Sequence, residues 1–481
     1  MASIKQQILS GVFYTALARY SSILISLFVT AVLARLLSPD EFGIVAIATV
    51  IINFFNLFTN IGFSAAIIQN KELTQKDLSH IYSFTLWMGL GLSVLFFASS
   101  WSIARYYHNF QLIAICQLLA VSLFFSSAAI VPNTLFFRDK NFKFIAYRTF
   151  FIQVITGLLA ISAALAGAGL YTLTIQPIVS SLLIYLVSLK KYPQQIHFTS
   201  GFQSIRKIWN YSMGQFLFNL VNYFTRNLDK LLIGKYMGMN PLGYYEKSYR
   251  LMMLPLQNIT YVITPVMHPI LSDYQNDKER LAQAHERIIR LLAFIGFPLS
   301  TLLYFGADEL VLLFFGSQWT ASIPVFRILS LTVCLQLILS SSGAFYQAGN
   351  DTRNLFICGV FSATTSTIGI LAGIFYFGSL EAIAWCILIA FSLNFIQCYI
   401  QLYRYTLHRP IRLFYKKLSS PLGVGILSGG ALYALSLYTI HWHLLVALSV
   451  KTICCLAITA CYVQCTHEYD ILGKIKQLKN K

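Results

Sequence analysis

The apolar segments of this chain restrict its fold more than any other feature of the sequence. Runs of about 20 predominantly apolar residues recur along its whole length, separated by short polar stretches. A helix of that length crosses the hydrocarbon core of a bilayer and satisfies its own backbone hydrogen bonds there. Because 57% of the 481 residues are hydrophobic and 11% are charged, little sequence is left for domains outside the membrane. We therefore expect an all-α integral membrane protein.

The hydropathy pattern predicts about fourteen transmembrane helices. Since this number is even, both ends of the chain should lie on the same side of the membrane. The expected spans are residues 12–34, 42–68, 81–103, 111–135, 149–167, 170–189, 210–234, 243–270, 289–306, 322–347, 355–376, 380–403, 419–439 and 443–464.

The basic residues are unevenly divided between the loops. Loops on the side of the termini hold 25 of the 35 lysines and arginines, Arg148 among them, whereas the opposite loops hold Arg35, Arg105 and Lys235. Basic residues accumulate in cytoplasmic loops, so both termini should be cytoplasmic. A net charge of +18 would also suit a nucleic-acid partner, but its distribution between apolar spans argues against one.

The stretch from Met213 to Gly238 carries charges in the middle of an apolar segment. Its polar residues recur every three or four positions, so they share one helix face. The other face holds Leu217, Val221, Phe224, Leu228 and Leu231. A charge inside a bilayer costs roughly 2.5–3.5 kcal/mol on insertion scales, so this face should point into the helix bundle or a water-filled cavity. Its residues are Gln215, Asn219, Asn222, Arg226 and Lys230, with Asp229 beside them.

The same polar spacing occurs 200 residues earlier, in the first apolar segment. Thr15, Arg19, Ser22, Ser26 and Thr30 correspond one for one to the polar face just described, and we expect the two polar-faced helices to confront each other.

The duplication extends into the turn that follows each polar-faced helix. Residues 34–45 match residues 234–245 without a gap, which places Gly43 over Gly243. Each half then has six spans, an even number, so the halves form a parallel repeat about an axis along the membrane normal. We expect a six-helix lobe at 1–203, a second at 204–410, and two additional helices with a cytoplasmic tail at 411–481.

Two motifs within this organisation resemble a known family. The turn RLLSPDEFG (35–43) and the seventh span, RNLDKLLIGKYMG (226–238), resemble the Wzx-type polysaccharide flippases. These form the polysaccharide-transport branch of the multidrug/oligosaccharidyl-lipid/polysaccharide exporter superfamily, and the likeness is strongest to its colanic-acid and teichuronic-acid exporters. The resemblance covers essentially the whole chain but does not identify a sugar.

The resemblance implies a function in the bacterial inner membrane. Members of the family move an undecaprenyl-diphosphate-linked oligosaccharide from the cytoplasmic to the periplasmic leaflet. The resemblance therefore implies a V-shaped pair of lobes around a cationic cavity, alternating access, and coupling to a proton or sodium gradient. It also implies membrane lipids, a polysaccharide polymerase and chain-length machinery as partners. No catalytic residue, metal site or cofactor is expected.

The chemistry of such a substrate directs attention to the arginines of the spans. A planar guanidinium donates two parallel hydrogen bonds to a diphosphate and keeps its charge when partly dehydrated. Arg19, Arg226 and Arg250 are therefore the expected diphosphate contacts, joined by Lys230 and by Asn219 and Asn222. Intrahelical salt bridges, of Arg226 with Asp229 or of Arg250 with Glu246, are the alternative.

Ion coupling requires a group that can lose its charge or release a cation. Asp229 and Glu246 are the expected candidates, since a carboxylate at membrane depth is readily protonated. Arg226 and Lys230 favour the ionised form of Asp229, which makes a fixed structural charge the main alternative for that residue.

Three further charged residues have no assigned role. Lys451 lies near the middle of the last span, where it could point into the bundle, toward the lipid diphosphate, or along the helix to an interface. Asp308 and Glu309 are expected in a solvated outer loop.

Two other functions compete with the flippase. A multidrug or cation antiporter of the same superfamily would bury acidic residues for its cargo, whereas seven basic residues against Asp229 and Glu246 favour an anionic cargo. A membrane polysaccharide polymerase would need a large outer loop, and every outer loop predicted here is short.

Overall fold

The protein is built from helices joined by short connections. The computed structural model describes residues 4–197, 202–272 and 277–466, and these residues contain no β-strand. The chain divides into two compact units, unit 1 (Met1–Gly243) and unit 2 (Tyr244–Lys481).

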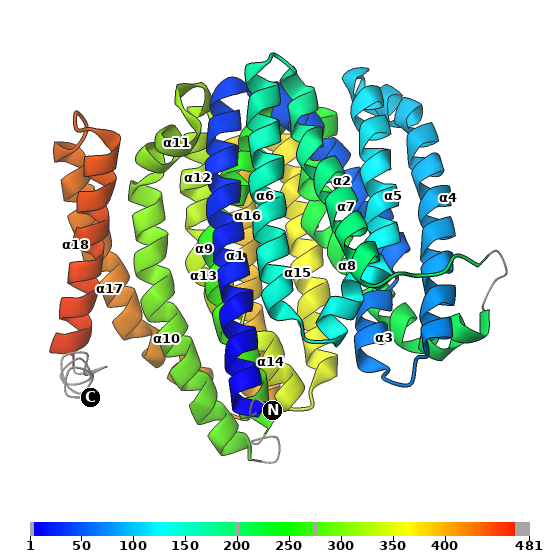
Figure 1. Cartoon of the computed structure of the whole chain (residues 1–481). Helices are drawn as coiled ribbons and strands as arrows, with labels where there is room; N and C mark the ends of the chain where they lie inside the picture. The colour runs from blue at the N-terminus through cyan, green and yellow to red at the C-terminus, as the bar shows by residue number, and fades with distance from the viewer. Residues whose placement is uncertain (1–3, 198–201, 273–276, 467–481) are drawn as a thin grey trace. The chain divides into compact units, whose positions relative to one another are not determined.

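The described residues of unit 1 form eight α-helices and the start of a ninth. Figure 1 shows α4 and α5 running side by side, and α1 is packed along α6. The elements are α1 (Ile4–Leu36), α2 (Pro39–Asn60), α3 (Phe63–Gln69), α4 (Gln75–Tyr107), α5 (Gln111–Arg138), α6 (Phe142–Leu165), the short helix η1 (Gly169–Tyr171), α7 (Thr172–Lys191), α8 (Phe202–Tyr236) and the beginning of α9 (Met239–Ser272).

Unit 2 contains the rest of α9 and all later helices. Its apolar core gathers around α10, α14, α16 and the beginning of α17. The elements are α10 (Lys278–Phe305), α11 (Ala307–Phe315), η2 (Ser317–Trp319), α12 (Ser322–Ser330), α13 (Thr332–Leu339), α14 (Ser342–Ala348), α15 (Thr352–Ala372), η3 (Gly373–Phe377), α16 (Leu380–Gln401), η4 (Leu402–Thr406), α17 (Ile411–Tyr438) and α18 (Leu444–Cys465).

The helices confirm a multi-pass membrane protein, although the expected number of fourteen spans is not confirmed. Eleven helices of the described chain are long and apolar enough to cross a bilayer, or twelve if the bent pair of 322–330 and 332–348 counts as one span. Helices α8 and α9 are long enough, at 35 and 34 residues, but they are not among these candidates. Some residues of both helices lie outside the described side chains, to which this count of spans is restricted.

Two of the expected spans are interrupted. The span expected at 42–68 breaks between α2 and α3, where Ile61 and Gly62 both have positive φ. The span expected at 322–347 bends by 42° between α12 and α13. The apolar pattern continues through both breaks, so hydropathy alone predicts unbroken helices there.

The SPDEFG turn is explained by helix capping. Ser38 is the N-cap of α2, and its side chain accepts the backbone N–H of Glu41. The Glu41 carboxylate accepts the N–H of Ser38 at 2.7 Å, and Pro39 occupies the first helical position, where no intrahelical donor is needed. These residues therefore begin a new helix immediately after α1 ends.

The glycine of this turn and its repeat mate lie in reciprocal close contacts. A Cβ added at Gly43 would come within 1.8 Å of the Met239 carbonyl oxygen, and one added at Gly243 within 2.0 Å of the Pro39 carbonyl oxygen. Only glycine permits the start of α9 to approach the start of α2 this closely. The one-for-one match of the two turns thus has a counterpart in space.

The division into compact units differs from the expected lobe boundary at 203/204. Helix α8 packs against α2, α3 and α4, so it belongs to unit 1 by its contacts. The Tyr223 hydroxyl donates to the Val50 carbonyl, and the Lys235 ammonium lies over the Tyr106 ring at 4.4 Å. The expected boundary follows the sequence repeat, whereas the boundary between the compact units follows the packing of the helices. The repeat-based domains remain a prediction.

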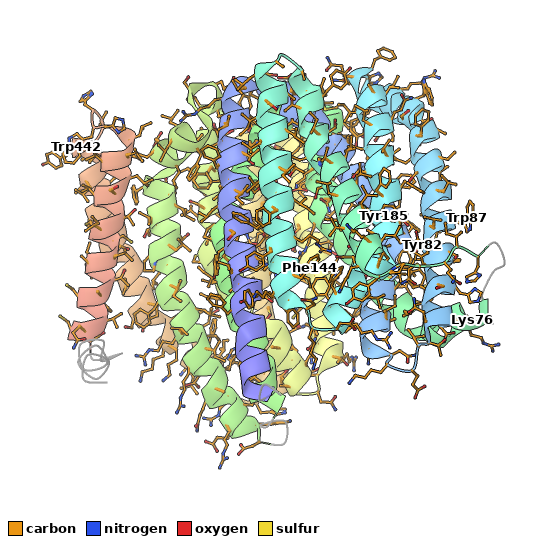
Figure 2. All side chains as sticks on the ribbon, viewed as in Figure 1. Lys76, Tyr82, Trp87, Phe144, Tyr185 and Trp442 are labelled. Carbon is orange, nitrogen blue, oxygen red and sulfur yellow. The ribbon has the colours of Figure 1, made fainter. Side chains whose placement is uncertain are left out.

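The two additional helices, α17 and α18, pack on each other and on α10 at one edge of unit 2 (Figure 1). Figure 2 shows Trp442 in the turn that joins them, where its indole is exposed. An exposed tryptophan at a helix end is typical of a membrane interface.

Candidate substrate-binding site

The first helix separates its apolar and polar residues onto different faces. Between residues 13 and 34 of α1, the exposed side chains are apolar and recur every three or four positions. They are Phe13, Leu17, Tyr20, Leu24 and Phe28. The polar residues at 15, 19, 22, 26 and 30 are half-buried. In a bilayer the exposed apolar face meets lipid, so the predicted polar stripe of α1 lies away from the lipid.

Arg19 and Ser22 occupy this half-buried face. The Ser22 hydroxyl donates a hydrogen bond of 2.7 Å to Gln153 Oε1 on α6. Helix α6 is the neighbour along which α1 packs. One residue of the polar stripe of α1 is therefore hydrogen-bonded to a polar side chain of unit 1. Arg19 lies one helical turn from this Ser22–Gln153 contact.

Helix α8 shows the same separation with more charge. Leu217 and Phe224 are exposed, as predicted for its lipid face, while Leu228 and Leu231 are half-buried. On the opposite face, Asn219, Asn222 and Lys230 are half-buried and Arg226 is exposed. The side chains of Gln215 and Val221 lie outside the described residues.

The charged turn of α8 does not form the intrahelical salt bridge considered from the sequence. Among the described residues, Arg226 makes no ion pair with Asp229. The Asp229 carboxylate is only 6% exposed and accepts the backbone N–H of Lys230 at 2.8 Å. Arg226 therefore presents an exposed guanidinium on the polar face of the helix, available to an anion.

The two polar-faced helices have different main neighbours in unit 1. Helix α1 packs along α6, and α8 packs on α2, α3 and α4. Arg19 therefore lies on α1, beside α6. The other predicted residues of unit 1 lie on α8, beside α2, α3 and α4, and are Asn219, Asn222, Arg226, Asp229 and Lys230. Their joint action on one ligand remains a prediction.

The last two predicted residues, Glu246 and Arg250, belong to unit 2. Both lie in α9, where Glu246 is half-buried and Arg250 is exposed. Between them, Lys247 is 1% exposed, and its ammonium lies 5.6 Å from the Phe315 ring and 5.7 Å from the Trp319 ring. These aromatic faces stabilise a cation that the bilayer disfavours. The pairing of Arg250 with Glu246 stays a prediction.

Arg148 was expected in a cytoplasmic loop, and that expectation is wrong. Helix α6 begins at Phe142, so Arg148 lies inside the helix, where it is 8% exposed. Its guanidinium donates to Ser188 Oγ at 2.9 Å and to Asn133 Oδ1 at 2.8 Å, which links α6 to α7 and α5. Hydropathy could not predict that Arg148 lies inside a helix, because Arg148 immediately precedes the apolar run and α6 begins several residues earlier.

The structure selects one of the three placements considered for Lys451 and corrects the solvated loop expected for Asp308 and Glu309. Lys451 points into the bundle, and its ammonium lies 2.5 Å from Glu309 Oε1. Glu309 is therefore buried in an ion pair, and Asp308 pairs with Arg327, so neither acid is a free, solvated loop residue. No sequence signal connects Glu309 with a lysine 142 positions later.

Comparison with known proteins gives one family match. A family model described as "Polysaccharide biosynthesis protein" matches residues 32–324, more than half of the chain. The teichuronic acid biosynthesis protein TuaB of Bacillus subtilis is 25% identical over 453 residues, which is 92% of each chain. The lipopolysaccharide biosynthesis protein WzxC of Escherichia coli is 24% identical over 361 residues, or 72% of this chain and 71% of the relative.

Solved structures give the fold. The lipid II flippase MurJ, in an inward closed conformation, superposes with a TM-score of 0.73 at 14% identity, covering 95% of this chain and 99% of that one. An inward-facing multidrug resistance MATE family transporter gives a TM-score of 0.61 at 15% identity, covering 80% and 95%. The chain therefore has the fold of these transporters.

Proposed function

The chain belongs to the polysaccharide biosynthesis protein family, and from this premise we propose that it is a flippase for a lipid-linked oligosaccharide. It is a multi-pass membrane protein with a transporter fold, not an enzyme. The proposed cargo is a polyprenyl-diphosphate-linked repeat unit, carried from the cytoplasmic to the periplasmic leaflet.

One observation supports this proposal above the others. A chain of a polysaccharide biosynthesis family has, over 95% of its length, the fold of a protein described as a lipid II flippase. A lipid-linked sugar combines a charged diphosphate, a polar head and a long apolar tail. Helices with an exposed apolar face and a separate polar face, as in α1 and α8, suit a cargo that keeps its tail in lipid while its head crosses.

The polar faces carry the chemistry expected of a diphosphate route. Arg226 presents an exposed guanidinium beside Asn222 and Lys230, and Arg19 lies on the half-buried face of α1. We assign Arg19, Arg226 and Arg250 to the diphosphate, with Lys230, Asn219 and Asn222 as further polar contacts. Bidentate donation makes arginine hard to replace by lysine at such a site.

The cellular setting follows from the distribution of basic residues. We place the protein in the bacterial inner membrane with both termini in the cytoplasm, because the loops on that side hold most of the lysines and arginines. A polysaccharide polymerase and chain-length machinery would receive the flipped unit as partners. No cofactor is required, and a proton or sodium gradient is the proposed source of energy.

A multidrug antiporter is the second candidate, since a MATE family transporter shares the fold. The family match argues for the flippase, and so does the basic character of the polar faces. A cationic drug would be repelled by Arg226 and Lys230 on the same face of α8. Uptake of a cationic dye by vesicles containing the protein would favour the antiporter.

Substitution of Arg19 tests the diphosphate assignment. We expect Arg19→Ala to lower transport of a lipid-linked oligosaccharide by at least about tenfold, because one charge-assisted bidentate contact is lost. Arg19→Lys should recover only part of the activity. Arg105→Ala, which removes an exposed arginine at the end of α4, is the control. Full activity of both Arg19 variants at equal expression would exclude Arg19 as a contact of the diphosphate.

Substitution of Asp229 and Glu246 tests the ion-coupling assignment. Asp229→Asn and Glu246→Gln remove a charge with little change of shape. If either carboxylate couples transport to a gradient, its variant should lose the acceleration produced by an imposed proton or sodium gradient while still binding substrate. An unchanged gradient dependence in one variant excludes that residue.

A further inference from the structure

The two additional helices pack on unit 2 through apolar side chains, and a few specific polar contacts add to this packing. On α17, the Ser428 hydroxyl lies 3.2 Å from the Thr301 hydroxyl of α10. On α18, the Cys455 thiol donates to the Pro298 carbonyl of α10 at 3.4 Å. Neutral contacts of this kind hold membrane helices together only weakly.

A buried ion pair joins α18 to α11. The Lys451 ammonium lies 2.5 Å from Glu309 Oε1 and donates to the Phe305 carbonyl at 2.8 Å. The Lys451 and Glu309 side chains are 4% and 8% exposed. Phe305 is the last residue of α10, where a cation is favoured, and Glu309 lies in the first turn of α11, where the helix dipole favours an anion.

The pair constrains α18 far more strongly than the neutral contacts. A charge left alone in a membrane interior is expensive, so separation of Lys451 from Glu309 would leave two uncompensated charges. Removing one partner of a buried pair is strongly destabilising, because the other charge is left uncompensated. Among the described residues, the buried Glu309 Oε2 has no hydrogen-bond partner, so the carboxylate depends on the contact of its Oε1 with Lys451.

The segment that receives Lys451 also holds two other helices of unit 2. Asp308 of α11 pairs with Arg327 of α12. Phe315 of α11 and Trp319 of η2 enclose the ammonium of Lys247 on α9. Basic side chains from α9, α12 and α18 thus contact the short stretch 308–319.

We infer that Lys451 is a positioning residue that fastens α17 and α18 to this stretch, so that the additional helices move with unit 2 as one rigid body during transport. The inference rests on the proposed function for its transport readout. It predicts that the contact between α17 and α10 stays closed throughout the transport cycle.

A disulfide across that contact tests the rigid attachment. Thr301→Cys with Ser428→Cys, in a background without the native cysteines, replaces two hydroxyls that are 3.2 Å apart. We expect rapid oxidation to a disulfide and unchanged flipping of a fluorescent polyprenyl-diphosphate oligosaccharide. Transport that stops on oxidation and returns on reduction would overturn the rigid-body inference. Failure of the disulfide to form in otherwise unaltered protein would overturn the docking itself.

The role of Lys451 is tested in the same background. Lys451→Met should slow disulfide formation by at least about tenfold, because α18 loses its charged anchor and Glu309 is left buried alone. The matched control is Lys417→Met, which removes a longer and more exposed pair, 3.6 Å from Glu286, between α17 and α10. Equal disulfide rates in the two variants would contradict the inference.

A third variant separates positioning from general damage. Lys451→Met combined with Glu309→Leu removes both charges, so it should restore disulfide formation and transport relative to Lys451→Met alone. No rescue would show that Lys451 acts otherwise than through Glu309. Disulfide rates need no substrate, so a protein that flips nothing but keeps these rates would count against the proposed function and leave the docking intact.

Discussion

At the scale of single residues, buried charges without an acidic partner are the most informative features. Arg148 is held by the neutral acceptors Ser188 and Asn133, and its guanidinium lies 5.2 Å from the Phe136 ring. Phe144, labelled in Figure 2, stacks on the same ring with a centroid separation of 4.8 Å. Arg148 of α6 therefore joins α5, α6 and α7 within unit 1.

Substitution of Arg148 should destabilise unit 1. Arg148→Lys cannot span both acceptors, so we expect a loss of roughly 1.5–3 kcal/mol, the usual contribution of a hydrogen bond to a charged group. The unfolding temperature in detergent measures the effect. Lys143→Met, an exposed lysine on the same helix, should stay within about 0.5 kcal/mol of the unaltered protein. Equal unfolding temperatures for both variants would refute the role of Arg148.

Asp351 gives a pH-dependent prediction outside the membrane spans. It caps α15 and accepts hydrogen bonds from Asn354 and from Thr406 Oγ1, the latter at 2.7 Å. Burial alone would raise the pKa of the Asp351 carboxyl, but these hydrogen bonds and Lys278 lower that pKa below its ordinary value. The ionised carboxylate therefore stabilises the folded protein.

The sign of the pH effect follows from the lowered pKa. The stabilisation is present above the ordinary aspartate pKa of about 3.9 and is lost as the pH falls through the lower folded value. Asp351→Asn should therefore cost about 1 kcal/mol at pH 7 and nearly nothing once the carboxyl is protonated. Unfolding temperatures of both proteins between pH 7 and pH 3 provide the comparison. A constant difference across that range would contradict the account.

At the scale of helices, the reciprocal glycine contacts make a sharp prediction. Gly43→Ala and Gly243→Ala place a methyl group within 2.0 Å of a carbonyl oxygen, so the starts of α2 and α9 must separate. We expect a loss of stability of at least about 1–3 kcal/mol from overpacking. The controls are Gly91→Ala and Gly430→Ala, where an added Cβ meets nothing within 4 Å. These exposed helical positions should be neutral or stabilised by about 0.4–1 kcal/mol.

Helical period made the faces of the helices predictable. Lipid and protein select different residues every three or four positions, so the half-buried polar stripe of α1 and the exposed Leu217 and Phe224 of α8 follow from spacing. The half-buried Leu228 and Leu231 and the exposed Arg226 of α8 do not. The matched turns containing Gly43 and Gly243 were also visible, because SPDEFG is a capping signal and the second turn repeats its glycine.

Features that depend on long-range contacts or local strain were not predictable. The break at Ile61 and Gly62 leaves the apolar pattern intact. The burial of Glu309 depends on Lys451, which joins it only in the folded chain. The absence of an ion pair between Arg226 and Asp229, within the described residues, likewise depends on side-chain geometry that spacing does not determine.

At the scale of the whole molecule, the proposal is that a glycolipid's charged head follows polar helix faces while its tail stays in lipid. The family match, the transporter fold and the separated faces of α1 and α8 support it together. The candidate residues lie on helices from both units, so both units are expected to contribute to one transport cycle.

The most direct measurement is flipping by the purified protein in vesicles. A fluorescent polyprenyl-diphosphate oligosaccharide is placed in both leaflets, and a membrane-impermeant quencher then reports its exchange. We predict that the protein makes the inner-leaflet probe accessible, that an imposed proton or sodium gradient accelerates this, and that Arg19→Ala and Arg226→Ala slow it while Arg105→Ala does not. Folded protein that leaves the inner-leaflet probe protected under either gradient would contradict the account.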